Sequence, residues 1–226
     1  MSKCAFGATK VEYLGHIISH GKVSMDATKV TCMVNWPVPK SIKELRGFLG
    51  LTGYYRRFIK DYGTIARPLT DMLKKNNYIW TDQSLTAFEK LKVAMVTAPV
   101  LALPDFTKEF VVEADASNQG IGAVLSQKGK PIAYFSRALS LRHQTLSVYD
   151  KKMMAILGAV KRWNAYLMGK SYKIQTDHNR LRFLLDQKTT TPAQQKWVLK
   201  MMGYDYQVIY KKGSNNVVAD SLSRRS

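Results

Sequence analysis

The chain contains few cysteines, few acidic residues and no long apolar run. Its two cysteines, Cys4 and Cys32, allow one disulfide at most, and nothing else in the sequence points to secretion, so we interpret both as reduced thiols. No apolar run approaches the ~18 residues of a membrane span, and the N-terminus lacks the apolar segment of a signal peptide. We expect an intracellular protein, cytoplasmic or nuclear, without a membrane segment.

The shortage of acidic residues gives the chain a strong positive charge. It has 35 Lys and Arg against 16 Asp and Glu, a net charge of +19 among 226 residues. The excess is spread out, at +8 for residues 1–100 and +11 for residues 101–226. Such a charge favours a polyanionic partner through counterion release, and we predict a nucleic acid. The alternative is a soluble basic protein without a specific partner.

Residues 1–100 have mainly helical signals after a short β segment. A strand is expected over residues 11–19, turning at Gly21 into a second strand. Asp26 can cap a helix that ends at Val34, and Ser41 with Glu44 forms a capping box for the next helix. Apolar residues at helical spacing predict helices over about 65–73 and 84–96. Two prolines, Pro99 and Pro104, mark a domain boundary.

After Pro104 the apolar periodicity changes to that of strands. Strands are predicted over 110–115, 120–127, 131–136, 172–177 and 204–210, with Gly129 in a hairpin turn. A long amphipathic helix is expected over about 146–167, and shorter ones over 180–185, 192–202 and 217–223. The order predicts an α/β fold with a five-stranded mixed sheet.

Three aspartates follow this order of elements. Asp115 and Asp177 end predicted strands, and Asp220 opens the last predicted helix. One such aspartate alone is more often a cap or turn residue. Three together at the edge of a mixed sheet predict a site for divalent cations, Mg²⁺ or alternatively Mn²⁺, which would activate a water molecule to attack a phosphodiester.

Several motifs resemble those of a known polyprotein family. Residues 105–226 are similar to the ribonuclease H domain of Ty3/gypsy-type long-terminal-repeat retrotransposons; the matching runs are 115–127, 176–178 and 219–224. Residues 1–100 resemble the reverse transcriptase of the same polyprotein, from its primer-grip hairpin through the thumb and connection; the matching runs are 3–6, 13–16, 48–51, 54–59 and 68–70. The resemblance implies a ribonuclease H-like fold, and an endonuclease that cuts the RNA strand of RNA–DNA hybrids with Asp115, Asp177 and Asp220 as catalytic metal ligands.

The chain departs from the family pattern in the polymerase motif. The family's polymerase site carries a Tyr-x-Asp-Asp turn, and no such run occurs here. We interpret residues 1–100 as the part of the reverse transcriptase downstream of that site, and we expect no polymerase activity from this chain.

The second departure concerns Lys152. The family's helix reads Glu-Lys-Glu-Leu-Leu-Ala, with the second Glu as a metal ligand, whereas this chain reads Asp150-Lys151-Lys152-Met153-Met154-Ala155. Asp150 cannot substitute, because positions 150 and 152 lie roughly 200° apart around a helix. A lysine here removes a ligand and adds repulsive charge, or it extends to solvent and vacates the site. Both possibilities predict lost or weakened cleavage, as in a pseudoenzyme.

Basic and aromatic residues suggest a nucleic-acid surface. Arginines can hold phosphates while aromatic rings stack on bases or sugars. The candidates are Tyr54, Arg56, Arg57, Lys161, Arg162, Lys211 and Lys212. We interpret Tyr55 and Phe58 as core residues, and His178 as a surface residue rather than an aid to product release.

These observations predict a retroelement-derived fragment that binds RNA–DNA hybrid or RNA, with ribonuclease H cleavage lost or weakened. One alternative is an active Mg²⁺-dependent ribonuclease H. A second is a protein-interaction module retained by a host, with a partner that the sequence does not identify. The identity of residue 152 distinguishes the fragment with lost or weakened cleavage from the active ribonuclease H.

Overall fold

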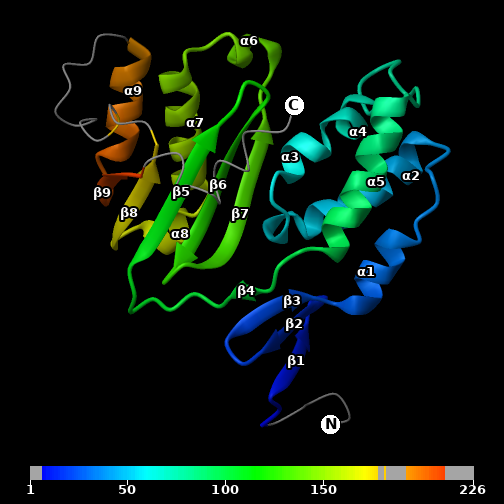
Figure 1. The fold of residues 1–226 in the computed structure, drawn as a ribbon, viewed down its shortest axis with the longest axis horizontal. Coiled ribbons are helices and arrows are strands. Elements are labelled where there is room, and N and C mark those ends of the chain that lie inside the picture. Colours follow the sequence, from blue (N-terminus) through cyan, green and yellow to red (C-terminus); the bar gives the residue numbers. More distant parts are fainter. Residues whose placement is uncertain (1–6, 178–180, 182–191, 212–226) are drawn as a thin grey trace. The chain divides into compact units, whose positions relative to one another are not determined.

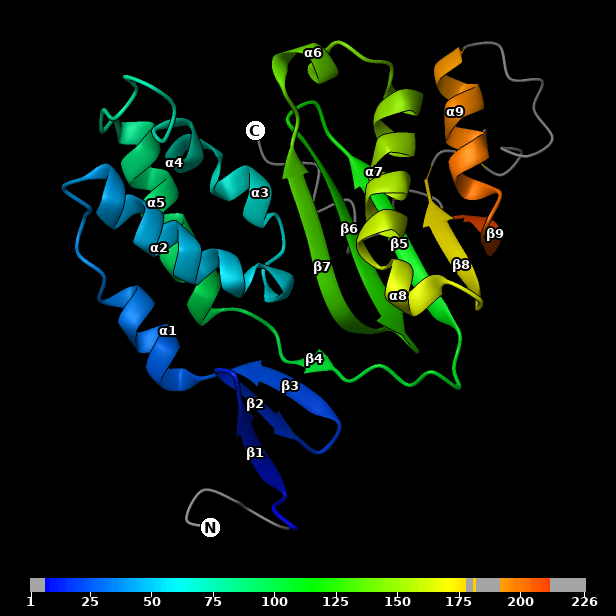
Figure 2. The same ribbon diagram turned by 180° about the vertical axis from the view of Figure 1, so that it is seen from behind.

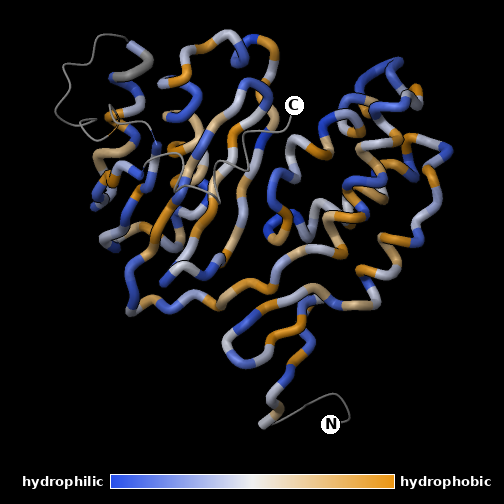
Figure 3. Tube along the Cα trace, in the orientation of Figure 1, coloured by the Kyte–Doolittle hydropathy of each residue, from blue (hydrophilic) through white to orange (hydrophobic). Residues whose placement is uncertain are grey.

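The computed structural model describes residues 7–177, 181 and 192–211 and divides the chain into two compact units, Met1–Pro104 and Asp105–Ser226. Each unit is described by itself (Figures 1 and 2). Polar and apolar residues are interspersed along most of the described elements (Figure 3). None of the described helices has the length and apolar character needed to cross a membrane.

The first unit begins with a small antiparallel sheet. Its strands, in the order β1-β2-β3-β4, are Lys10–Tyr13, His16–Ser19, Lys22–Met25 and Leu101–Ala102. The single strand expected over residues 11–19 was wrong, because the chain turns at Leu14 and Gly15. Both residues have positive φ, 48° and 73°, and this ends β1.

Helices form the rest of the first unit. They are α1 (Ala27–Val34), α2 (Ile42–Tyr54), the short 3-10 helix η1 (Arg56–Phe58), α3 (Tyr62–Ile65), α4 (Arg67–Asp71) and α5 (Asp82–Val96). Asp26 accepts from the amide of Thr28 and Ser41 from that of Glu44, so both predicted caps are confirmed. Glu44 accepts from the amide of Lys40 instead of completing the expected capping box. Around Ala66, the helix predicted over 65–73 is replaced by the short α3 and α4.

Two buried phenylalanines join helices in the core of the first unit. Phe48 of α2 and Phe88 of α5 are fully buried, with ring centroids 4.6 Å apart. Trp80 packs edge-on against Phe88, and its indole N–H donates to the carbonyl of Pro39. These contacts pack α5 against α2 and anchor the segment between α1 and α2.

The second unit is built on the predicted five-stranded mixed sheet, and its strands lie in the order β7-β6-β5-β8-β9 (Figure 1). The strands are β5 (Phe110–Ala116), β6 (Gly120–Gln127), β7 (Lys130–Ala138), β8 (Ser171–Thr176) and β9 (Asp205–Tyr210). The β5, β6 and β7 strands are antiparallel, whereas β8 is parallel to both β5 and β9. The β6–β7 turn has positive φ at Lys128 and Gly129, as the expected two-residue hairpin requires.

Helix α7 (Val148–Arg162) packs on β5 and β6, and Figure 2 shows it in front of the sheet. A Cβ at Gly158 would lie 3.0 Å from the ring of Phe135, so glycine permits this close approach. The helix predicted over 146–167 is interrupted at the buried Trp163, after which α8 (Asn164–Leu167) begins. The remaining described helices are α6 (Leu141–Gln144) and α9 (Pro192–Met201). Predicted helices over 180–185 and 217–223 lie outside the described residues, apart from Leu181.

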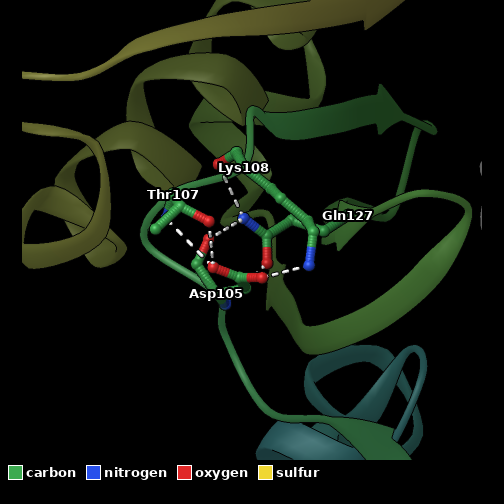
Figure 4. Close-up of polar contacts among 4 residues, drawn as sticks. All are labelled: Asp105, Thr107, Lys108 and Gln127. Carbon is green, nitrogen blue, oxygen red and sulfur yellow. Dashed lines mark hydrogen bonds and ion pairs between the residues drawn. The ribbon is translucent and has the colours of Figure 1, made fainter.

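A buried glutamine organises the segment that leads into β5 (Figure 4). The side chain of Gln127 accepts from the amide of Asp105 at 2.9 Å and donates to the carbonyls of Asp105 and Lys108 at 2.8 and 2.9 Å. The carboxylate of Asp105 accepts from Thr107 and pairs with the Lys108 ammonium, and these bonds hold the pKa of Asp105 well below its usual range. The four residues therefore form one closed hydrogen-bonded group, which we call the Gln127 knot.

Candidate functional site

Two predicted aspartates meet at one edge of the five-stranded sheet. Asp115 lies near the end of β5, and Asp177 directly follows β8. These strands are parallel neighbours, paired from Phe110 with Tyr172 to Glu113 with Gln175. Because parallel strands end at the same edge, the two carboxylates lie together, as the order of elements predicted.

The side chain of Lys152, from α7, extends to the same edge of the sheet. Its ammonium lies 3.5 Å from a carboxylate oxygen of Asp115 and donates to Oδ1 of Asp177. The lysine side chain is 9% exposed and that of Asp115 is 6% exposed. Of the two expected orientations, the structure therefore has the lysine inside the site rather than extended to solvent. A buried ammonium is tolerated only when it is paired in this way.

Lys151 is a second buried lysine beside the same edge. Its ammonium donates to the side-chain oxygen of Asn118 at 3.0 Å, in the turn between β5 and β6. Ser117 shapes that turn, because its hydroxyl accepts from the amides of Gln119 and Gly120. Helical periodicity did not predict that Lys151 would be buried, since its partner comes from another element.

The first unit has its own cluster at the β1–β2 turn. The hydroxyl of Tyr54 donates to the carbonyl of Leu14 at 2.7 Å, and that of Tyr55 donates to the carbonyl of Gly15 at 2.8 Å. The ring of His16 packs against both tyrosines. The end of α2 thus fixes a turn 40 residues earlier in the chain, and we call these contacts the tyrosine clamp. Sequence reasoning missed it, although the adjacent tyrosines were themselves a visible signal.

Known proteins resemble the whole chain. Residues 80–174 match a family described as the RNase H-like domain found in reverse transcriptase. The Pol polyprotein of transposon 297 from Drosophila melanogaster is 42% identical over 99% of this chain, and that of transposon gypsy from the same fly is 37% identical over 99%. The Tf2-3 polyprotein of Schizosaccharomyces pombe is 35% identical over 99%. The chain belongs to the Pol polyprotein family of Ty3/gypsy-type retrotransposons.

This Pol chain spans only about a fifth of the length of these relatives, from 18% to 23%. Among solved structures, the foamy viral protease-reverse transcriptase in complex with RNA/DNA hybrid matches with a TM-score of 0.81 and 22% identity. The match covers 93% of this chain and 30% of the viral one. The structure of the same viral protein in complex with dsDNA also matches with a TM-score of 0.81. These similarities establish a ribonuclease H-like fold for the Pol chain.

The ribonuclease H-like fold implies a divalent-metal site, and the described residues do not fit one. Asp220, the third predicted ligand, lies outside the described residues, as does His178. Within the described ranges, no three His, Cys, Asp or Glu side chains gather closely enough to hold a metal. More decisively, an ammonium is placed at both Asp115 and Asp177, and an ammonium donates hydrogen bonds but cannot coordinate a cation. At such short range its charge also repels a divalent ion.

The predicted nucleic-acid contacts of the Pol chain lie on several elements. Arg56, Lys161 and Arg162 are exposed, whereas Arg57 is half-buried with its guanidinium 5.6 Å from the centre of the Phe58 ring. The basic pair at the last turn of α7 is also well placed to stabilise that helix end. Lys211 lies 3.7 Å from the carboxylate of Glu113, and Lys212 is outside the described residues.

The aromatic residues near these arginines have different environments. Tyr54 is 50% exposed, so its ring remains accessible although its hydroxyl is bonded to Leu14. Tyr55 and Phe58 are buried, which confirms that they are core residues.

Proposed function

We propose that this Pol chain binds RNA–DNA hybrid, or RNA, and that its ribonuclease H cleavage is lost or strongly weakened. The observation that carries the proposal is the Lys152 ammonium paired with both Asp115 and Asp177. Any Mg²⁺ or Mn²⁺ is expected to bind weakly, because the carboxylates that would hold it are already engaged. We assign residues 1–100 to the primer-grip, thumb and connection remnant of reverse transcriptase, and residues 105–226 to the ribonuclease H-like domain.

Two observations support nucleic-acid binding. The net charge of +19 favours a phosphate backbone over neutral partners. The foamy viral protein of the same fold has been solved in complex with RNA/DNA hybrid.

The absence of a Tyr-x-Asp-Asp run from this sequence leads us to expect no primer extension.

A cleavage and binding assay on labelled hybrid tests the proposal. With Mg²⁺ or Mn²⁺ we expect binding without efficient cleavage by the unaltered chain. Rapid cleavage that Asp115→Asn abolishes would instead establish an active ribonuclease H. Failure to bind hybrid or RNA at low salt would favour the alternative of a protein-interaction module. Capture of protein partners would then test that alternative.

The exposed Arg56 offers a sharper test of the binding surface. Arg56→Ala should weaken hybrid binding and reduce the salt slope by about one contact. Arg46→Ala is the matched control, since Arg46 is also exposed in the first unit but is not a predicted contact. If a fluorescence anisotropy titration showed equal effects of the two substitutions, Arg56 would not be a specific contact with the nucleic acid.

A further inference from the structure

We infer that the Lys152 ammonium is the resident cation of this site, holding the ends of β5 and β8 against α7 in place of a divalent metal. Lys152 then does more than remove a ligand. The substituted side chain has a positive structural role, and the second unit assembles without Mg²⁺ or Mn²⁺. Assembly around Lys152 is independent of the proposed function, whereas its effect on hybrid binding rests on that function.

The contacts of Lys152 link three separate segments. The ammonium reaches Asp115 on β5 and Asp177 after β8, while its backbone belongs to the second turn of α7. Lys151, the preceding residue, ties the same helix to Asn118 at 3.0 Å. Helix α7 is therefore joined to one edge of the sheet by two adjacent side chains.

The charges of the described groups support this assignment. Two carboxylates at one sheet edge repel each other strongly in a buried setting unless a cation lies between them. Here the Lys152 ammonium pairs with the carboxylates of both Asp115 and Asp177, and Lys151, bonded to Asn118, carries a second positive charge on the same turn of α7. Breaking such a buried pair by removing one partner is strongly destabilising, because the remaining charge stays buried.

A site that contains its own cation also interacts differently with the phosphate backbone of a nucleic acid. A site made of carboxylates alone repels phosphate until a divalent ion is bound, whereas this one presents no such excess of negative charge. Hybrid binding by the unaltered chain is then independent of divalent cations. Lys152→Glu places a third negative charge among the described groups and makes both folding and binding depend on metal.

Thermal unfolding and hydrogen exchange of the full chain test the structural role. In EDTA, Mg²⁺ or Mn²⁺, the melting temperature of the unaltered chain should change by less than about 1 °C, as expected when a ligand is far below its dissociation constant. In EDTA, Lys152→Glu should melt lower by about 4 °C or more and lose amide protection in β5 and the start of α7. Mn²⁺ should restore much of that loss.

Control variants keep the test interpretable. Lys170→Glu makes the same charge change at an exposed lysine of the second unit and should leave the metal response flat. If Lys152→Glu does not fold, Lys152→Gln is used, and it should be less stable than the unaltered chain in EDTA. Stabilisation of the unaltered chain by several degrees in Mg²⁺ or Mn²⁺ would overturn the inference. So would a Lys152 variant that is as stable in EDTA as the unaltered chain.

Hybrid affinity, measured at constant ionic strength, tests the effect on binding. For the unaltered chain, affinities in EDTA and in Mg²⁺ should agree within about twofold, less than 0.5 kcal/mol of binding free energy. Lys152→Glu should bind more weakly in EDTA and recover in Ca²⁺. If the unaltered chain binds no hybrid at all, the proposed function fails, whereas the unfolding data still decide whether Lys152 is the resident cation. A strong Mg²⁺ requirement for binding by the unaltered chain would contradict the inference itself.

Discussion

At the scale of single residues, Lys152 occupies the position between Asp115 and Asp177, and its ammonium pairs with both carboxylates. The sequence has a lysine where the family has a glutamate, but it did not show whether this side chain points into the site or out to solvent. The structure directs it inward, since partners from β5 and from the end of β8 are within reach of its ammonium. Those partners lie 37 and 25 residues away in sequence, so no local pattern could have decided between the two orientations.

Replacing this lysine should change cleavage. Lys152→Glu adds a carboxylate and removes the competing ammonium, so hybrid cleavage with Mg²⁺ should appear or rise at least about tenfold, equivalent to ~1.4 kcal/mol off the barrier. Lys152→Gln removes the charge without adding a ligand and should recover less. Initial rates on a labelled hybrid measure both variants.

Two outcomes would contradict this prediction. The unaltered chain could cleave hybrid as fast as Lys152→Glu. Alternatively, adding Asp115→Asn to Lys152→Glu could leave cleavage intact, which would place the activity at another site.

At the scale of elements, the β1–β2 turn depends on the tyrosine clamp. Gly15 and Gly21 have nearly equal positive φ, 73° and 70°, so alanine is strained at both by about 1–2 kcal/mol. A Cβ at Gly15 would also lie 2.6 Å from the hydroxyl oxygen of Tyr55, whereas nothing lies within 4 Å of one at Gly21. Gly15→Ala should therefore cost about 1 kcal/mol more, the value of the hydrogen bond from Tyr55.

Urea unfolding of Gly15→Ala, Gly21→Ala and Tyr55→Phe measures the contribution of the clamp. Equal losses for the two glycine variants would show that Tyr55 does not hold the turn. The hydroxyl-free Tyr55→Phe should show a loss similar to the difference between those variants.

The same elements show which parts of the fold could be predicted. Local chemistry was sufficient where it acts within a few residues: Asp26 and Ser41 cap their helices, and Gly129 makes the predicted hairpin turn. The turn at Leu14 was missed because tyrosines 40 residues later hold its carbonyl and that of Gly15. The amphipathic helix expected over about 146–167 is present as α7, which ends at Arg162, but the burial of its two lysines depends on partners from the edge of the sheet.

At the scale of the whole molecule, charge should dominate the affinity for nucleic acid. With a net charge of +19 on the chain, binding to hybrid should weaken steeply and log-linearly as salt rises, because each phosphate contact releases a counterion. Titrations at several salt concentrations give the slope. Affinity that stays flat between low and moderate salt, for both hybrid and RNA, would remove the electrostatic basis of the proposed partner.

The Gln127 knot has a consequence for proteolysis. Lys108 is a trypsin target with a 43% exposed side chain, yet its carbonyl is bonded to the buried Gln127. A protease must pull such a backbone free before cutting it, so exposure alone is not sufficient. Trypsin should cut after Lys75, exposed between α4 and α5, well before it cuts after Lys108. Gln127→Ala should make Lys108 an early cleavage site, detectable by mass spectrometry, while Lys75 is cut as before. This one amide side chain would thus protect the start of the second unit from tryptic cleavage.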